Sequence, residues 1–287
     1  MTKLAAAAYP IEALTTWDAL VAKLGAWLDQ SEDANFVVFP EYAGLEAGLI
    51  GATSALTVAD ETQRCADSAD QYWRALSDLS QAQDKIILSG SLPARAADGA
   101  LVNRAGLFLP DGRSAFTDKT ILTPWERRET ELRGAPYRHV YDAPGLPRVG
   151  VMACYDGEFP LHGRALKQAG AAILTMPSAT DGMRGHTRVQ LGARARALGC
   201  NALVMLSQIV GTCPQSSFAD VSTGCAGLYT PPDEGLPDTG ILAETALNEP
   251  GWAIAHMPTF PDAVSRQINI SAHWDEQSTQ AQIAAFK

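Results

Sequence analysis

The stretch Val149-Gly-Val-Met-Ala-Cys154-Tyr-Asp-Gly-Glu-Phe-Pro160 decides how this chain is organised. Its first five residues are small or apolar, a run too short for a helix and β-branched enough for a buried strand. The run stops at Cys154, and an Asp-Gly pair and a proline break the chain before a helical pattern resumes. We therefore expect a thiol at the carboxyl end of a strand, close to the amino end of a helix. Free backbone N–H groups there lower a thiol pKa and can hold an oxyanion.

The position of Cys154 needs partners before it indicates catalysis, because most buried cysteines only pack. Glu41 is the first candidate. The residues Asn35-Phe-Val-Val-Phe-Pro40 form a short apolar run ended by proline, and Glu41 is the first residue beyond it. A carboxylate there projects from the rim of a sheet, where general bases commonly sit.

Lys119 is the second candidate partner. It ends the alternating stretch Arg113-Ser-Ala-Phe-Thr-Asp-Lys119, which opens after the turn Pro110-Asp-Gly112. A lysine beside a thiolate lowers the thiol pKa and can stabilise charge on a tetrahedral intermediate. Each charged residue alone is better explained as a solvated surface charge. Together, Glu41, Lys119 and Cys154 supply a base, an electrophilic stabiliser and a nucleophile, the set that thiol-based acyl transfer needs.

The order and context of these three residues resemble the nitrilase superfamily of carbon–nitrogen hydrolases. The contexts are Phe-Pro-Glu41-Tyr, Asp-Lys119-Thr and Ala-Cys154-Tyr-Asp-Gly-Glu-Phe-Pro. The similarity runs from about residue 3 to about residue 258. It includes a buried asparagine, a Pro-Ser strand end, an Arg-Ala helix and a late hairpin region: Asn103, Met176–Ala179, Ala193–Leu198, Pro231–Gly235 and Gly240–Glu244. The resemblance implies a four-layer α-β-β-α sandwich and a homo-oligomer, either a dimer or larger.

The chain departs from the family pattern on the Arg-Ala helix. The family usually has Glu-Asn there, whereas this chain has Gly199-Cys200 and so lacks a carboxylate that could support the site. The family also carries a second glutamate some way after the lysine. Trp125-Glu126-Arg-Arg-Glu129 offers two choices. Glu126 has the spacing of the aliphatic amidases and is the first choice, and Glu129 is the alternative.

The rest of the chain alternates helical and strand patterns without a low-complexity linker, which predicts a single α/β domain over residues 1–287. Two sheets with helices on both outer faces would explain strands that are continuously apolar. Thr15 is expected to cap the first helix. Further helices are expected near 60–82, 160–169 and 186–199. Strands are expected within 1–10 and 35–39 and near 85–90, 102–109, 113–118, 149–153, 171–175, 202–206, 224–230, 241–245 and 252–257, followed by a polar tail to Lys287.

The bulk composition is that of an intracellular enzyme. The 287 residues are 46% hydrophobic and 19% charged, enough to bury a large core. A net charge of −10 argues against nucleic acid or an anionic membrane as a main partner. The five cysteines are odd in number and contain no Cys-x-x-Cys pair, so neither a disulfide framework nor a zinc site is predicted. No apolar run reaches membrane-spanning length, and the expected location is cytoplasmic.

These residues predict an amidase-type hydrolase. Cys154 would attack the carbonyl of a small amide, with Glu41 as base, and with Lys119 and the backbone N–H of Tyr155 stabilising the oxyanion. Glu126 would orient substrate and lysine, and no metal or organic cofactor is needed. The family's true nitrilases usually have Trp-Glu after the cysteine, whereas Tyr155-Asp156 resembles the amidase branches.

Four alternatives remain open from the sequence. Nitrile or N-carbamoyl hydrolysis would use the same residues. A catalytically silent homologue acting as a binding subunit would keep the fold. A different cysteine enzyme would pair Cys154 with a histidine, and the chain has five: His139, His162, His186, His256 and His273.

A basic segment suggests what the substrate carries. Thr180-Asp-Gly-Met-Arg184-Gly-His-Thr-Arg188 follows the Pro-Ser strand end, so it is expected on the same rim as Cys154. Arginine grips carboxylates in bidentate fashion, and Arg184 or Arg188 is a candidate to anchor a substrate that bears an acid group as well as an amide. The simpler alternative is that both arginines only solvate a helix start.

Overall fold

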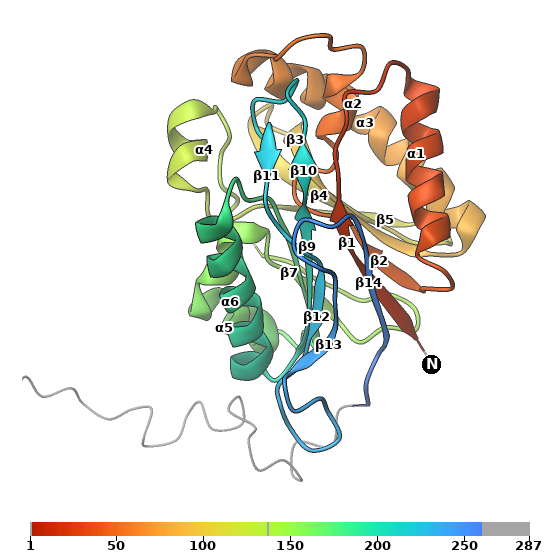
Figure 1. Ribbon diagram of the computed structural model, residues 1–287, viewed down its shortest axis with the longest axis vertical. Helices are drawn as coiled ribbons and strands as arrows, with labels where there is room; N and C mark the ends of the chain where they lie inside the picture. The colour runs from red at the N-terminus through yellow and green to blue at the C-terminus, as the bar shows by residue number, and fades with distance from the viewer. Residues whose placement is uncertain (1, 137, 260–287) are drawn as a thin grey trace, which may run out of the picture.

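The computed structural model describes residues 2–136 and 138–259. The expected polar tail and His273 lie outside these residues, so the prediction of one domain over residues 1–287 stays a prediction. In the described part, strands form one continuous curved sheet with two halves, and a small separate hairpin. Figure 1 shows the strands running through the middle of the molecule, with helices on either side.

The first half of the sheet has a parallel centre. Its strands β1, β2 and β3 are parallel, whereas β4 and β5 continue antiparallel from β3, and β14 pairs antiparallel with β1. The bounds of these strands are β1 (Lys3–Tyr9), β2 (Phe36–Val38), β3 (Ile86–Arg95), β4 (Leu101–Phe108), β5 (Ser114–Asp118) and β14 (Gly251–His256).

The second half repeats this plan. Strands β7, β8 and β9 are parallel, with β6 antiparallel at one side and β12 and β13 antiparallel at the other. The two halves join where the end of β1 pairs with the end of β9, Tyr9 opposite Ile209. The bounds are β6 (Val140–Tyr141), β7 (Val149–Val151), β8 (Ile173–Ser178), β9 (Leu203–Ile209), β12 (Gly227–Tyr229) and β13 (Ile241–Glu244); the separate hairpin is β10 (Gly211–Thr212) with β11 (Val221–Ser222).

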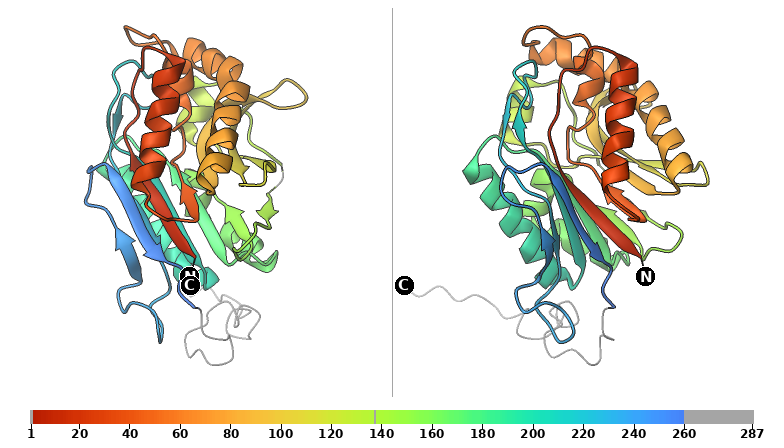
Figure 2. Two further views of the ribbon diagram at one scale, coloured as in Figure 1. Left: turned by 90° about the vertical axis from the view of Figure 1, so that its right-hand side faces the viewer. Right: turned by 45° about the vertical axis from the view of Figure 1, so that its right-hand side comes forward.

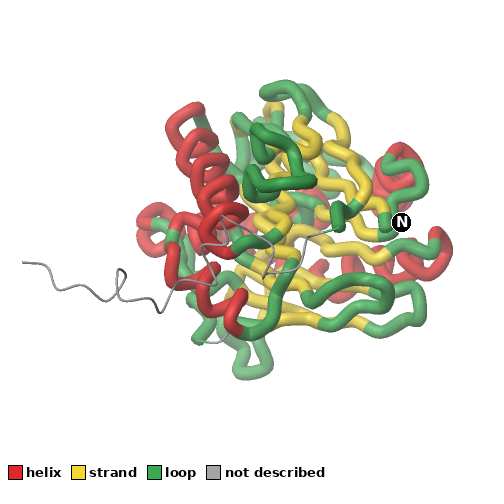
Figure 3. The backbone as a smooth tube through the Cα atoms, turned by 90° about the horizontal axis from the view of Figure 1, so that it is seen from below, coloured by secondary structure: helices red, strands yellow, loops and turns green. Residues whose placement is uncertain are grey.

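Helices cover both outer faces. Figure 2 shows α1 and α3 on one side of the strands and α5 and α6 on the other, and Figure 3 shows the strands enclosed between helices. The bounds of the helices are α1 (Trp17–Gln30), α2 (Leu45–Leu49), α3 (Val58–Gln83), α4 (Pro124–Glu129), α5 (Pro160–Gln168) and α6 (Met183–Cys200), with one helical turn η1 (Cys154–Glu158).

Three apolar clusters show that the arrangement has four layers. Along β1, Leu4, Ala6 and Ala8 face residues of the second half of the sheet, including Met205. The alternate residues of β1 pack instead with α1, α2 and α3, and a third cluster joins the second half of the sheet to α5 and α6. Strands buried on both faces need no polar face, which is why their sequences are continuously apolar. The predicted α-β-β-α sandwich is confirmed.

Sequence and structure differ mainly in short elements. Helix α1 is capped by Thr16, whose side chain accepts the N–H of Ala19, so the prediction of Thr15 as the cap was wrong by one residue. Helices α2 and α4 were not expected because five- and six-residue helices are too short to show a helical period.

No helix among the described residues has the length and apolar character to cross a membrane.

Candidate active site

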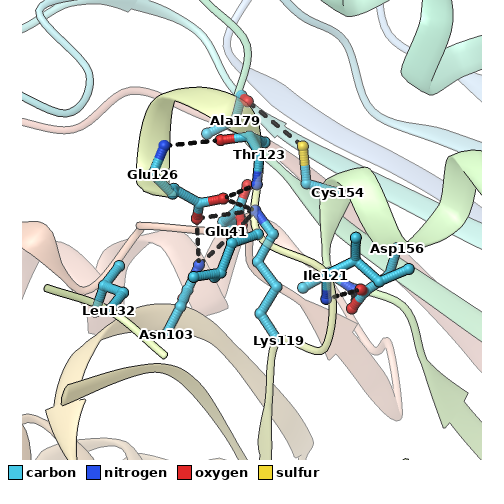
Figure 4. Close-up of polar contacts among 12 residues, drawn as sticks. Glu41, Asn103, Lys119, Ile121, Thr123, Glu126, Leu132, Cys154, Asp156 and Ala179 are labelled. Carbon is cyan, nitrogen blue, oxygen red and sulfur yellow. Dashed lines mark hydrogen bonds and ion pairs between the residues drawn. The ribbon is translucent and has the colours of Figure 1, made fainter. Parts of the chain in front are cut away.

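The ends of several strands meet at one buried cluster. Glu41 follows β2, Lys119 follows β5 and Cys154 follows β7. Figure 4 shows their side chains together with those of Glu126 from α4 and Asn103 from β4. The structure therefore brings together the three residues singled out first in the sequence and one of the two candidate second glutamates.

Lys119 lies at the centre of this cluster. Its Nζ is 2.8 Å from Glu41 Oε1 and 2.8 Å from Glu126 Oε2, and its side chain is 1% exposed. Burial alone lowers a lysine pKa, but the charges of Glu41 and Glu126 outweigh burial and raise the pKa of Lys119 above its ordinary value. The ammonium group therefore stays charged, as an oxyanion stabiliser must.

The two glutamates have pKa shifts of opposite sign. Burial raises the pKa of Glu41, and the charge of Lys119 only partly offsets it. Burial acts on Glu126 too, but Lys119 and the Tyr42 hydroxyl outweigh it and lower the pKa of Glu126. Neighbouring carboxyls whose pKa values are pushed apart suit different roles. Glu41 is suited to accept and return a proton, and Glu126 to remain ionised.

Cys154 has a strained backbone and a protonated thiol. Its φ of 48° lies in the left-handed region, which non-glycine residues rarely adopt and which recurs at functional sites. Its Sγ is 3.6 Å from the carbonyl oxygen of Ala179. Burial and the charge of Glu41 raise the pKa of the thiol well above its ordinary value, and Lys119 does not compensate. The expectation of a lowered thiol pKa was wrong, because the thiol lies buried beside a carboxylate. A neighbouring base must therefore take its proton.

Asn103 and Tyr42 fix the carboxylates from the other side. Asn103 Nδ2 donates to Glu41 Oε1 at 2.9 Å, and its side chain is buried. The Tyr42 hydroxyl donates to Glu126 Oε1 at 2.6 Å. The sequence indicated Asn103 through the family resemblance, whereas Tyr42 was only quoted as context. Tyr42 directly follows Glu41 in the sequence, and this adjacency could have identified it as a site residue.

The structure separates Glu126 from Glu129. Helix α4 starts with a capping box in which Glu126 Oε2 accepts the N–H of Thr123 at 2.7 Å and Thr123 Oγ1 accepts the N–H of Glu126. This box aims the Glu126 carboxylate inward, where it also accepts hydrogen bonds from Lys119, Tyr42 and Asn103. The Glu129 side chain is 48% exposed and lies beside Arg128. Only Glu126 belongs to the cluster.

Asp156 is a site residue that the sequence prediction missed. Its Oδ1 accepts the N–H of Ile121 at 2.7 Å, and its Oδ2 accepts the N–H of Ala153 at 3.2 Å and that of Thr120 at 3.3 Å. One buried carboxylate thus ties the segment after Lys119 to the turn that carries Cys154 (Figure 4). Burial raises the pKa of Asp156 to about 6.

Gly90 sets the position of Glu41 from the neighbouring strand. It has a φ of 71°, and a Cβ at this residue would lie 1.9 Å from the carbonyl oxygen of Pro40. The segment that carries Glu41 can approach β3 this closely only because residue 90 has no side chain.

A cavity of about 770 Å³ opens onto the cluster. Glu41, Lys119, Glu126 and Cys154 line it together with Tyr155. Such a volume accommodates a small organic substrate. The ring of Tyr155 packs edge-on against Phe159, 5.0 Å between centroids.

The basic segment reaches the same cavity. Arg184 and Arg188, from the first two turns of α6, both line it, and so does Arg128 of α4. Arg188 Nε is 3.2 Å from Glu158 Oε1, whereas Arg184 is exposed and its guanidinium has no ion pair within residues 2–136 and 138–259. The two predicted arginines therefore differ, and Arg184 is the one available to a ligand. Arg128 was not singled out in the sequence.

The histidine alternative receives no support. His162 Nδ1 lies 3.7 Å from Asp156 Oδ1, and His186 Nδ1 is 2.9 Å from Gln208 Oε1. Neither histidine lines the cavity, nor do His139 and His256.

Among the described residues no group of three or more His, Cys, Asp or Glu side chains could hold a metal ion. All five cysteines are free and buried.

Comparisons with known proteins agree with this geometry. A sequence profile described as carbon–nitrogen hydrolase matches residues 3–224. A probable hydrolase, YhcX, of Bacillus subtilis is 28% identical over 244 residues, which cover 84% of this chain and 46% of that protein. The chain thus spans about half the length of this relative. A deaminated glutathione amidase of Synechocystis is 28% identical over 197 residues, covering 63% of this chain and 67% of the relative.

Solved structures share the fold. Nit3 of Saccharomyces cerevisiae, a member of branch 10 of the nitrilase superfamily, superposes with a TM-score of 0.69 at 20% identity, covering 97% of this chain and 95% of Nit3. An amidase from Nesterenkonia sp. AN1, in a form with acrylamide added to its active-site cysteine, gives a TM-score of 0.72 at 18% identity over 98% of both chains. Because a family profile matches residues 3–224, the chain belongs to the carbon–nitrogen hydrolase family, and its fold is shared with the nitrilase-superfamily protein Nit3.

Proposed function

We propose that this protein is an amidase, which hydrolyses the amide of a small acid and releases ammonia through a thioester on Cys154. One observation carries the proposal: a charged Lys119 lies 2.8 Å from each of two buried carboxylates, next to a thiol at the floor of a substrate-sized cavity. A base, a fixed positive charge and a nucleophile are the groups that acyl transfer needs.

In the first half-reaction the Cys154 sulfur attacks the amide carbon. Glu41 accepts the thiol proton, because its raised pKa makes it a stronger base than an ordinary carboxylate. The carbonyl oxygen takes up the negative charge, and Lys119 with the backbone N–H of Tyr155 stabilises it. The carbon–nitrogen bond then breaks, and Glu41 returns the proton so that ammonia leaves.

In the second half-reaction water attacks the thioester carbon. Glu41 takes a proton from this water, the carbon–sulfur bond breaks, and the proton returns to the sulfur. Glu126 stays ionised throughout and holds Lys119 in place, while Asn103 holds Glu41. No step in this sequence requires a metal or an organic cofactor.

The cavity indicates a substrate with a second functional group. Arg184 has no ion pair within the described ranges, lines the cavity and can form a charge-assisted bidentate contact with a carboxylate. Arg188 is a weaker candidate to bind a substrate carboxylate because it already forms an ion pair with Glu158. We therefore propose an amide that also carries a free acid group, consistent with the deaminated glutathione amidase activity named for one relative.

Ammonia release from a panel of small amides, nitriles and N-carbamoyl compounds tests the proposal. Amides should be the best substrates, and Cys154→Ala should lower turnover to background, while Cys65→Ala and Cys200→Ala as matched controls should retain activity. Turnover of nitriles or N-carbamoyl compounds alone would replace the amidase assignment. No turnover of any compound would favour a silent binding subunit.

The predicted homo-oligomer is part of this proposal. Helices α5 and α6 expose large apolar side chains, Leu161 at 76% and Leu191 at 60%, with Met183 also exposed. Several large apolar side chains exposed on two contacting helices favour a protein–protein contact there. A second copy of the chain is the proposed partner, and sedimentation at several concentrations tests it. The cytoplasmic location stays a prediction.

A further inference from the structure

One wall of the cavity is built by a loop that no motif in the sequence singled out. The hairpin of β10 and β11 carries residues 213–220 at its tip, and Ser217, Phe218 and Asp220 of this tip line the cavity. Figure 1 shows the hairpin between α4 and the end of the molecule where α2 and α3 lie. The tip therefore lies beside α4, the helix that carries Glu126.

Phe218 is the large side chain of this wall. Its ring centroid is 5.1 Å from that of Tyr42 and 5.3 Å from that of Trp125. Tyr42 in turn donates its hydroxyl hydrogen to Glu126. Phe218 thus forms an aromatic wall of the cavity together with Tyr42 and Trp125.

Glu61, in the first turn of α3, is hydrogen-bonded to the tip of this hairpin. Its Oε1 accepts the Ser216 hydroxyl at 2.7 Å, and its Oε2 accepts the backbone N–H of Ser217 at 2.6 Å. Ser216 Oγ accepts the N–H of Phe218 at 3.1 Å, which extends the contact to the aromatic residue itself. The Glu61 side chain is fully buried and does not line the cavity.

The burial of Glu61 is unfavourable unless its oxygens are hydrogen-bonded. Burial raises its pKa, and its bonds to Ser216 and Ser217 oppose that shift. A buried carboxylate without partners is strongly destabilising, so the loop and the carboxylate hold each other in one arrangement. A second contact, from the Leu56 N–H to the Gln215 carbonyl at 3.0 Å, anchors the same tip.

We infer that Glu61 is a positioning residue, which fixes Phe218 as the wall that limits the size of the acyl group. The inference rests on the amidase proposed above, because it assigns a specificity to the same cavity. Loss of the Glu61 carboxylate should change which molecules reach Cys154, and only through Phe218.

Alkylation of Cys154 by two reagents, 2-iodoacetamide and the bulkier 2-bromohexanamide, tests the inference without requiring turnover. Each reagent forms a carbon–sulfur bond as its halide leaves, and peptide mass spectrometry locates the product. The wild type should strongly prefer the small reagent. Phe218→Ala should lower this preference about tenfold, as the removal of a pocket wall does. Glu61→Gln should lower it in the same direction, because a glutamine has one accepting oxygen where Glu61 uses two, for the Ser216 hydroxyl and the Ser217 N–H.

The double variant separates positioning from stability. If Glu61 acts through Phe218, then Glu61→Gln adds nothing to Phe218→Ala, whereas independent effects would add. Asp70→Asn, an exposed carboxylate on the same helix, is the matched control and should leave the preference unchanged.

Three outcomes overturn the inference: an unchanged preference in Glu61→Gln, additive effects in the double variant, or no labelling of Cys154 in the wild type. Failure of the proposed function appears separately, as labelled protein that releases ammonia from no amide.

Discussion

The Oδ1 atom of Asp156 lies 2.7 Å from the backbone nitrogen of Ile121, and this bond joins the two segments that carry the nucleophile and the lysine. Asp156 is two residues beyond Cys154, and Ile121 is two residues beyond Lys119. The relative placement of thiol and ammonium therefore depends on a residue whose carboxylate binds the backbone of both segments. Enzymes lose activity steeply when such groups shift by about 1 Å.

Asp156→Asn should consequently lower kcat more than it raises KM. The amide oxygen can still accept one N–H, but its nitrogen cannot accept those of Thr120 or Ala153. We expect kcat to fall about tenfold or more and the free energy of unfolding to drop by about 1–3 kcal/mol. Steady-state kinetics and denaturant unfolding measure the two effects. Asp238→Asn, at an exposed position, is the control, and an equal loss in both variants would contradict the role of Asp156.

Glu126→Gln and Glu129→Gln form a matched pair on one helix. The first change removes the negative charge beside Lys119, and we expect turnover to fall about 100-fold or more. The second removes a half-exposed carboxylate and should change turnover less than about twofold. Initial rates at saturating amide decide the ranking. A larger loss in Glu129→Gln would show that the cluster is not the reacting site.

The pH profile of kcat/KM should report the proton on Glu41. As a base, Glu41 must be deprotonated, so activity rises with pH through its pKa. Burial raises that pKa, and the acid limb should therefore lie above the ordinary glutamate value of about 4.3. Lys119 stays charged because its pKa is raised, so its deprotonation should cause no loss below about pH 9. An acid limb at or below the ordinary value would contradict the assignment of Glu41 as base.

Arg184→Ala should weaken the preference for substrates that carry an acid group. The matched substrates are an ω-amide with a free carboxylate and its neutral methyl ester. A charge-assisted bond contributes about 1.5–3 kcal/mol, so the ratio of their kcat/KM values should fall about tenfold or more. Arg188→Ala should have a smaller effect because Arg188 pairs with Glu158. Unchanged ratios in both variants would show that this segment does not bind a carboxylate.

Much of the fold was predictable because its signals are local. Apolar runs ended by Pro40 and Cys154 marked strand ends, and the α-β-β-α layering agreed with strands that are apolar on both faces. Thr123 and Glu126 also form a local signal, a capping box at the correct spacing, and it would have favoured Glu126 and predicted α4.

The remaining features depend on contacts between distant parts of the chain. Asp156 meets residues 120 and 121, and Glu61 meets Ser216 across 155 positions. No pattern within a single segment reveals such pairs. The pKa of Cys154 was misjudged for the same reason, because the approach of Glu41 and the burial of the thiol arise only in the folded chain.

Covalent trapping on Cys154 is the most direct test of the central claim that this residue forms a thioester. The protein is mixed with a slowly hydrolysed amide, quenched in acid within one turnover and digested, and the peptide containing Cys154 is examined by mass spectrometry. We predict a mass increase equal to the acyl group on this peptide alone, absent in Cys154→Ala. An unmodified Cys154 peptide from protein that is releasing ammonia, or an acyl group on another cysteine, would contradict it.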